Sequence, residues 1–150
     1  MGKVAIVVGS KNDLELIEGA KEILKNFDVE FDVFVLSAHR TLDDTISFAE
    51  NAEKKGYEVI IAAAGMSAHL PGIISAKTIL PVIGVPLPTS EIKGMDALLS
   101  IVQMPTGVPV ATMSIGKAGV KNAALFSIEI LARNDEKLKE KLIEYKKNLK

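Results

Sequence analysis

The sequence has no cysteine and no tryptophan, and aromatic residues make up only 5% of its 150 positions. The absence of cysteine excludes disulfides, thiolate nucleophiles, zinc–thiolate sites and iron–sulfur clusters. The low aromatic content disfavours a flavin carrier, which stacks such rings against its cofactor. The chain must therefore be stabilised by an apolar core, and 48% hydrophobic residues over this length are enough to form one.

The sequence also lacks an excess of charge of one sign, because its 18 Lys and Arg residues are balanced by 19 Asp and Glu residues, which gives a net charge of −1. Binding to a nucleic acid normally needs a clear excess of basic residues. No apolar run approaches the roughly 18–20 residues that a membrane span needs, and the first run is too short for a signal peptide. We therefore expect a cytoplasmic protein with a small-molecule partner, and neither a nucleic acid nor a membrane.

Charged residues are scarce in the middle of the chain, from residue 59 to residue 116. The charged side chains in this segment are Lys77, Glu91, Lys93 and Asp96. With membrane insertion disfavoured, so apolar a segment must be buried in the core or between subunits. Its two expected helices, 71–79 and 95–103, have too little polar surface to face water alone. This pattern predicts a homo-oligomer packed through those helices, with a pocket that excludes water.

Short apolar runs alternate along the chain with stretches in which apolar residues recur at helical spacing. The expected strands are 3–8, 30–36, 58–63, 82–85 and 108–113. The expected helices are 13–27, 41–55, 71–79, 95–103 and 119–132. Continuously apolar strands indicate a sheet covered on both faces, so the alternation predicts a three-layer α/β/α fold with a doubly wound, five-stranded parallel sheet. Its expected strand order is 2-1-3-4-5, as in flavodoxin, which places the ligand crevice at the carboxyl ends of strands one and three.

The last segment, 134–150, differs from the rest because it is rich in lysine and glutamate, with apolar residues along one helical face. We interpret it as an amphipathic helix packed on the domain or on a neighbouring subunit; a basic tail for nucleic acid is the alternative. No linker or repeat divides the chain. We therefore expect one catalytic domain over 1–150, with its α/β core at 1–133.

Three loops should meet at the crevice, and the first follows strand one. It reads Gly9-Ser10-Lys11-Asn12-Asp13, and its free backbone N–H groups beside a helix start suit a phosphate. The alternative is structural, with Ser10 or Asn12 capping the helix, and the two interpretations are compatible. The loop matches neither the Walker motif nor GxGxxG, which weakens nucleoside-triphosphate and dinucleotide interpretations.

The second loop, Ser37-Ala38-His39-Arg40, places an imidazole beside a guanidinium. Arg40 can bind a phosphate bidentately, and His39 can give and take protons near neutral pH. Alternatively, the histidine packs and the arginine forms a surface ion pair. The helix that follows has Thr41 and Asp44 in positions that resemble a capping box.

The third loop, Gly65-Met66-Ser67-Ala68-His69-Leu70-Pro71-Gly72, is uncharged except for its histidine and ends in a helix with proline in its first turn. Its small residues let the backbone approach a planar ligand, and His69 can donate to that ligand or to a carboxylate; a structural histidine is the alternative. Two histidines without a further ligand at suitable spacing argue against a metal site. Ser67 does not lie in a GxSxG elbow.

Several long motifs occur in order along the chain: GSKND, SAHRT, AGMSAHLPG, LPVIGVP, SIVQMPTGVPVATM and KNAALFSIEIL. Together they closely resemble the N5-carboxyaminoimidazole ribonucleotide mutase family of purine biosynthesis, from residue 3 to about residue 134. The resemblance implies an isomerase without cofactors that moves a carboxylate from the exocyclic nitrogen of an aminoimidazole ribonucleotide to ring carbon C4, through released carbon dioxide. It also implies a homo-octamer with sites shared between subunits.

The resemblance further implies roles for residues of the three loops. His39 would protonate the departing nitrogen and then remove the C4 proton, with His69 as the second catalytic histidine beside the base and the migrating carboxylate. Ser10, Asn12 and Arg40 would contact the phosphoribosyl group, with Asp13 on the ribose hydroxyls. The other implied substrate-binding residues are Ser37, Gly65, Met66, Ser67, Ala68 and Leu70.

Two departures from the family's usual motifs bear on the reaction. The usual GSxSD has serine where this chain has Asn12, whose amide can still donate to a phosphate. The usual AGGAAHLPG is changed at Met66 and Ser67, beside the reacting carboxylate. An enzyme that carboxylates aminoimidazole ribonucleotide directly with carbon dioxide is therefore an alternative, although the SAHRT and AHLPG motifs favour the mutase.

A non-enzymatic binding module with the same fold is a more remote alternative. A receiver domain would need an acidic phosphoacceptor at the end of strand three, but Ala62-Ala63-Ala64-Gly65 stands there. An electron carrier with a bound flavin is disfavoured by the scarcity of aromatic residues. Neither module is therefore favoured by the sequence.

Overall fold

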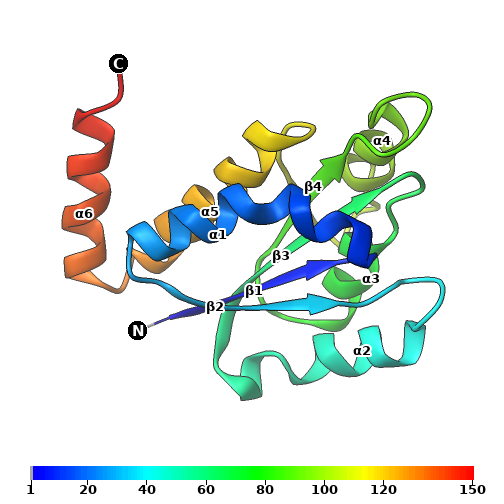
Figure 1. The fold of residues 1–150 in the computed structure, drawn as a ribbon. Coiled ribbons are helices and arrows are strands. Elements are labelled where there is room, and N and C mark those ends of the chain that lie inside the picture. The colour runs from blue at the N-terminus through cyan, green and yellow to red at the C-terminus, as the bar shows by residue number, and fades with distance from the viewer. Residues whose placement is uncertain (1) are drawn as a thin grey trace.

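The protein is built around a five-stranded parallel sheet with the order β2-β1-β3-β4-β5, which can be followed in Figure 1. The computed structural model describes residues 2–150. The predicted strand order and parallel pairing are confirmed. The strands are β1 (Lys3–Val8), β2 (Glu30–Val35), β3 (Tyr57–Gly65), β4 (Val82–Leu87) and β5 (Ala111–Thr112).

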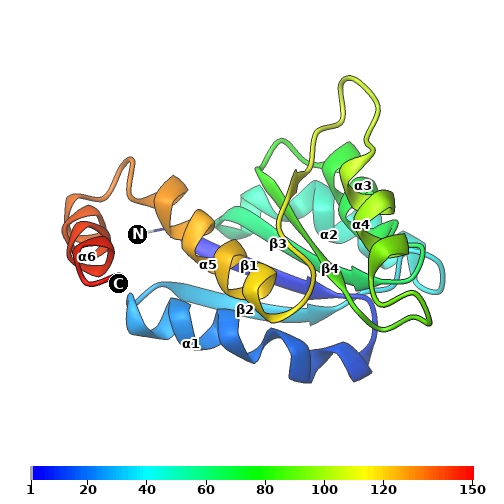
Figure 2. The same ribbon diagram turned by 90° about the horizontal axis from the view of Figure 1, so that it is seen from above.

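Helices cover both faces of the sheet, as seen from above in Figure 2. On one face lie α1 (Glu18–Asn26) and α5 (Lys117–Leu131); on the other lie α2 (Leu42–Asn51), α3 (Leu70–Lys77) and α4 (Met95–Val102). Alternate residues of β1 contribute to the two cores, so that Ile6 packs on one side and Ala5 on the other, both fully buried. Burial on both faces explains why this strand has no polar alternation.

The fifth strand is much shorter than the predicted 108–113. Only Ala111 and Thr112 pair with β4. Pro109 has no N–H group to donate, and its carbonyl accepts a hydrogen bond from Oγ of Ser75 at 2.6 Å instead of joining the sheet. Residues 108–110 of this apolar run therefore precede β5 and do not pair with β4.

Two predicted helices are interrupted. The predicted helix 13–27 begins as a 3-10 helix, η1 (Lys11–Ile17), before α1 follows. The predicted helix 41–55 ends as α2 at Asn51, and the short η2 (Glu53–Lys55) then closes on Gly56, whose φ of 90° lies in the left-handed region. The other predicted core helices match α3, α4 and α5 closely.

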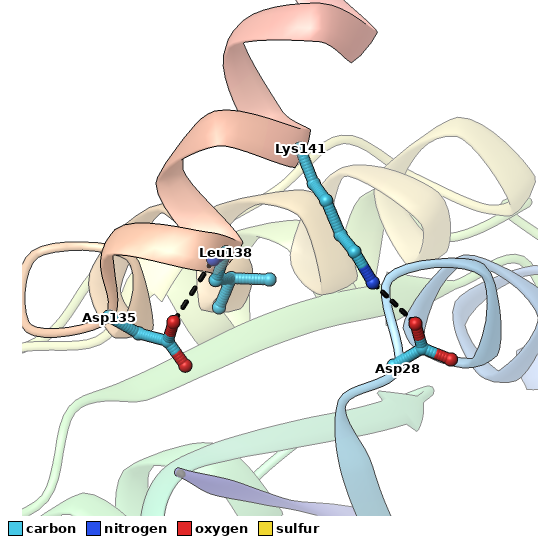
Figure 3. Close-up of polar contacts among 4 residues, drawn as sticks. All are labelled: Asp28, Asp135, Leu138 and Lys141. Atoms are coloured by element: carbon cyan, nitrogen blue, oxygen red, sulfur yellow. Dashed lines mark hydrogen bonds and ion pairs between the residues drawn. The ribbon is translucent and has the colours of Figure 1, made fainter.

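The C-terminal segment forms α6 (Glu136–Lys147), which lies at the opposite end of the sheet from the carboxyl ends of the strands (Figure 1). The carboxylate of Asp135 caps it by accepting a hydrogen bond from the backbone N–H of Leu138 at 3.0 Å. Figure 3 shows this cap beside the ion pair between Lys141 and Asp28, which joins α6 to the turn after α1. The predicted amphipathic helix is confirmed, and it packs on its own chain through buried Leu138.

The outer side of α4 carries large apolar side chains that the chain itself does not cover. Met95, Leu99 and Val102 are 50%, 52% and 49% exposed, whereas Ala97 and Ile101 of the same helix are fully buried. The exposed residues are spaced three or four apart and thus form one stripe. No helix among residues 2–150 is long and apolar enough to cross a membrane.

Candidate active site

The loops that follow β1, β2, β3 and β4 line a pocket of about 520 Å³. Every site residue expected from the sequence lies in it, although these residues come from three separate loops. The pocket occupies the crevice predicted from the strand order, at the carboxyl ends of the central strands. Its lining consists of Gly9, Ser10, Asn12, Asp13, Ser37, Ala38, His39, Arg40, Ala64, Gly65, Met66, Ser67, Ala68, His69, Leu70 and Thr89.

The loop after β1 is ordered by Ser10, which caps η1. Oγ of Ser10 accepts a hydrogen bond from the backbone N–H of Asn12 at 3.2 Å, and the carbonyl of Ser10 accepts one from the N–H of Asp13 at 3.0 Å. The capping interpretation is therefore confirmed for Ser10, and the side chain of Asn12 stays exposed.

Asp13 is a buried acidic residue of the pocket, with only 8% of its surface exposed. No hydrogen bond within residues 2–150 reaches its carboxylate, whose oxygens therefore stay accessible from the pocket and are not sealed in the core. Burial of the residue raises the pKa of the Asp13 carboxyl above its ordinary value. A carboxylate kept without a donor in a pocket is suited to accept hydrogen bonds from a ligand, such as those of paired hydroxyl groups.

The loop after β2 is held rigid by Ser37. Oγ of Ser37 accepts a hydrogen bond from the backbone N–H of Arg40 at 3.1 Å, and its backbone N–H donates to Oγ1 of Thr41 at 2.9 Å. The hydroxyl of fully buried Thr45 donates to the Ser37 carbonyl at 3.1 Å. The prediction that Thr41 caps α2 is wrong, because its hydroxyl is engaged with Ser37 and makes no cap bond.

This bracing leaves the side chain of Arg40 exposed at the pocket. Among the described residues, none of the ion pairs involves Arg40, so its guanidinium is free to bind an anion. The alternative interpretation of Arg40 as half of a surface ion pair is therefore wrong within residues 2–150.

The loop after β3 approaches the end of β4 so closely that it needs a glycine. A Cβ atom added to Gly65 would lie 1.8 Å from Oγ1 of Thr89. The following residue, Met66, has a φ of 55° in the left-handed region and a side chain that is 62% exposed. The loop ends at His69, where α3 begins with Pro71 in its first turn, as predicted.

The two histidines of the chain meet in the pocket. Nε2 of His39 lies 2.7 Å from Nδ1 of His69, and the rings cross edge to face with centroids 4.8 Å apart. A hydrogen bond between two imidazole nitrogens needs one N–H group and one lone pair, so a single proton lies between them. The pair can therefore hold a proton donor and a proton acceptor side by side. No cluster of three or more His, Asp or Glu residues suited to a metal ion occurs from residue 2 to residue 150.

The pocket lining also includes Gly9 and Ala38, which belong to the predicted loops but were given no role of their own, and two residues outside those loops, Ala64 and Thr89. Ala64 directly precedes the third loop, whereas Thr89 comes from the loop after β4, which the sequence did not indicate as part of the site. Its position has a signal in the strand order, because β4 pairs with β3 so that Leu87 lies opposite Gly65. Whatever follows Leu87 must lie beside the third loop.

Comparisons with known proteins agree with this geometry. The family model described as AIR carboxylase matches residues 3–150. The N5-carboxyaminoimidazole ribonucleotide mutase of Escherichia coli (strain K12) is 53% identical over 145 residues, which cover 97% of this chain and 86% of that protein. The enzyme of the same name from Saccharolobus solfataricus is 51% identical over 150 residues, covering 100% of this chain and 94% of that one. The crystal structure of Treponema denticola PurE superposes with a TM-score of 0.88 at 27% identity, covering 98% of this chain and 90% of that chain.

Proposed function

The chain belongs to the AIR carboxylase family, and from this membership and the pocket we propose that it isomerises N5-carboxyaminoimidazole ribonucleotide to the 4-carboxy compound. The observation that carries the proposal is the contact of His39 with His69 in the same pocket as the unpaired Arg40. A proton-transferring pair and a free cation on rigid loops suit a phosphorylated substrate whose carboxylate must move. Membership of an enzyme family also disfavours a non-enzymatic module.

The transfer proceeds in two balanced steps. First, the bond between the exocyclic nitrogen and its carboxylate breaks, carbon dioxide leaves, and the nitrogen takes a proton from His39. Then C4 attacks the carbon dioxide, a C–C bond forms, and the C4 proton passes back to His39. Because the histidine ends as it began, the reaction needs no oxidant, reductant or other co-reactant. His69 supports both steps by holding the imidazole of His39 through the shared proton.

Substrate binding is divided among the three loops. Arg40, Ser10 and Asn12 bind the phosphate, and Asp13 accepts hydrogen bonds from the ribose hydroxyls. Ser37 acts through the loop that it braces. The base and its carboxylate then lie against the third loop, where small residues permit close approach: Gly65, Met66, Ser67, Ala68 and Leu70.

A second candidate is the direct carboxylation of aminoimidazole ribonucleotide by carbon dioxide. It is favoured by Met66 and Ser67, which stand beside the expected position of the carboxylate in place of smaller residues. The deciding experiment supplies each of the two ribonucleotides separately at low bicarbonate and follows the 4-carboxy product by absorbance. The proposal expects turnover of the N-carboxylated substrate. Turnover of the uncarboxylated one alone, rising with dissolved carbon dioxide, would establish the second candidate instead.

We also propose that the exposed stripe of α4 packs against further copies of the chain. Met95, Leu99 and Val102 are apolar and about half exposed in the single chain, and burial of such a stripe contributes about 25 cal/mol for each Å² removed from water. Ile79, which follows α3, is 83% exposed and belongs to the same scarcely charged segment. The octamer implied by the sequence motifs and the cytoplasmic location both stay predictions.

A further inference from the structure

Met66 has a backbone conformation that its residue type disfavours. Its φ of 55° lies in the left-handed region, where residues with a Cβ atom are strained and glycine is not. Only Asp28 and Lys93 share this feature among residues other than glycine in the described chain, and neither lines the pocket. The strain at Met66 therefore coincides with the candidate site.

The side chain of Met66 is also poorly covered for an apolar group, with 62% of the residue exposed. Its apolar neighbours in the pocket lining are buried: Ala64 at the end of β3 is 7% exposed, and Ala68 and Leu70 of the third loop are 2% exposed. Of the large apolar side chains that line the pocket within residues 2–150, Met66 alone is mostly exposed. Methionine is unbranched and flexible, so it can close over ligands of irregular shape.

The proposed reaction creates a need for such a group. Carbon dioxide released in the first step is small and uncharged, so neither an ion pair nor a strong hydrogen bond can retain it. It stays near C4 only if apolar groups cover it and exclude water. If it escapes, the enzyme releases uncarboxylated aminoimidazole ribonucleotide instead of the product.

We infer that Met66 closes over the bound substrate and retains carbon dioxide between the two steps of the transfer. This inference rests on the proposed function, because it concerns the intermediate of that reaction. It also explains why a strained residue occupies this position. Glycine would adopt the left-handed backbone without strain, but it would place no apolar side chain at the pocket. Met66 is thereby a residue that sets the efficiency of transfer rather than the strength of phosphate binding.

The test is a measurement of label retention. Substrate with a ¹³C carboxylate is converted in buffer that contains unlabelled carbon dioxide, and the initial product is analysed by mass spectrometry, with a blank without enzyme for spontaneous decarboxylation. The unmodified protein should keep most of the label in its product. Met66→Gly should increase the ratio of lost to retained label by about tenfold, in the range that one lost apolar contact typically costs, and Met66→Leu should restore retention. Lys93→Gly is the matched control, because it makes the same backbone change outside the pocket.

The outcomes separate this inference from the proposed function. If Met66→Gly keeps the label as well as the unmodified protein does, the role of Met66 is refuted while the isomerase function stands. If the unmodified protein exchanges its label completely, or forms no 4-carboxy product from the labelled substrate, the proposed function fails. Unchanged folding of Met66→Gly by circular dichroism is expected, because glycine relieves the strain at this φ.

Discussion

Nε2 of His39 and Nδ1 of His69 lie 2.7 Å apart, although the two residues belong to loops that follow different strands. The contact joins the only histidines of the chain into a unit with one shared proton. A unit of this kind can deliver a proton and recover it at the same place, which an isomerisation requires. The first predictions concern its two halves.

For His39, we predict that substitution by asparagine leaves the fold intact and severely reduces turnover. The side chain is exposed, so little packing is lost, whereas loss of a general acid and base lowers kcat by about 10²–10⁴-fold. The rate is measured with the N-carboxylated ribonucleotide, and thermal unfolding serves as the folding control. Activity close to that of the unmodified protein would show that another group transfers the proton.

For His69, we predict that alanine lowers kcat less than the change at His39 does, and that glutamine partly restores it. Glutamine can offer a hydrogen-bond partner to His39, whereas alanine cannot. The informative measurement is the dependence of kcat on pH in both variants, because a residue that acts through His39 must alter that profile. A fall in rate with an unchanged profile would assign His69 to packing or substrate contact alone.

For Arg40, we predict that alanine raises KM about tenfold to a hundredfold and changes kcat little. A charge-assisted hydrogen bond contributes about 1.5–3 kcal/mol, and a phosphate remote from the reacting atoms is bound equally in ground and transition states. Lysine at this position should recover part of the loss, because it keeps the charge without the bidentate fork. Steady-state kinetics of both variants distinguish this role from a structural one, in which KM would stay unchanged.

For Asp13, we predict that asparagine makes the protein more stable near neutral pH and weakens substrate binding. Burial raises the pKa of the Asp13 carboxyl above 3.8. The protein is therefore most stable with respect to this group below the unfolded-state pKa, where the carboxyl is neutral in both states, and it loses that stability as the pH rises through the folded-state pKa. At neutral pH the buried charge therefore opposes folding, and its removal should stabilise by about 0.5–2 kcal/mol.

The measurement for Asp13 is the free energy of unfolding of both proteins as a function of pH. The gain in unfolding free energy of Asp13→Asn over the unmodified protein should shrink as the pH falls toward the ordinary pKa of a carboxyl group. The Asp13 side chain of the unmodified protein then becomes neutral as well. A variant that is less stable at neutral pH would show that the carboxylate has a stabilising partner. Substrate affinity, measured by calorimetry, should fall in either case.

The sequence predicted the position of the site well because that position depends on local patterns. Continuous apolar strands indicated a sheet covered on both faces, and the strand order then placed the loops with His39 and His69 at one edge. Conversely, the interruption at Pro109 was hidden in an apolar run, so the fifth strand was predicted too long. A local pattern does not report which hydrogen bonds a carbonyl makes.

Relations between loops were harder to predict, because they depend on the packed structure. Nothing in the spacing of His39 and His69 shows that their rings touch, and Thr89 follows a proline in a stretch that resembles an ordinary turn. The left-handed backbone of Met66 is likewise invisible in the sequence, since methionine gives no signal for it. The sequence indicated the chemical character of each loop, but not the contacts between loops or their backbone conformations.

For α4, we predict that Leu99→Glu breaks the oligomer without unfolding the chain. Leu99 is 52% exposed in the single chain, so a charge there is tolerated in water, but a carboxylate buried between subunits is strongly unfavourable. Size-exclusion chromatography with light scattering should show smaller particles, and circular dichroism should show an unchanged helix content. Leu149→Glu is the matched control, because Leu149 is 59% exposed and lies beyond α6. A stable, active monomer of the unmodified protein would contradict the proposed packing, since the exposed stripe of α4 would then have no partner to cover it.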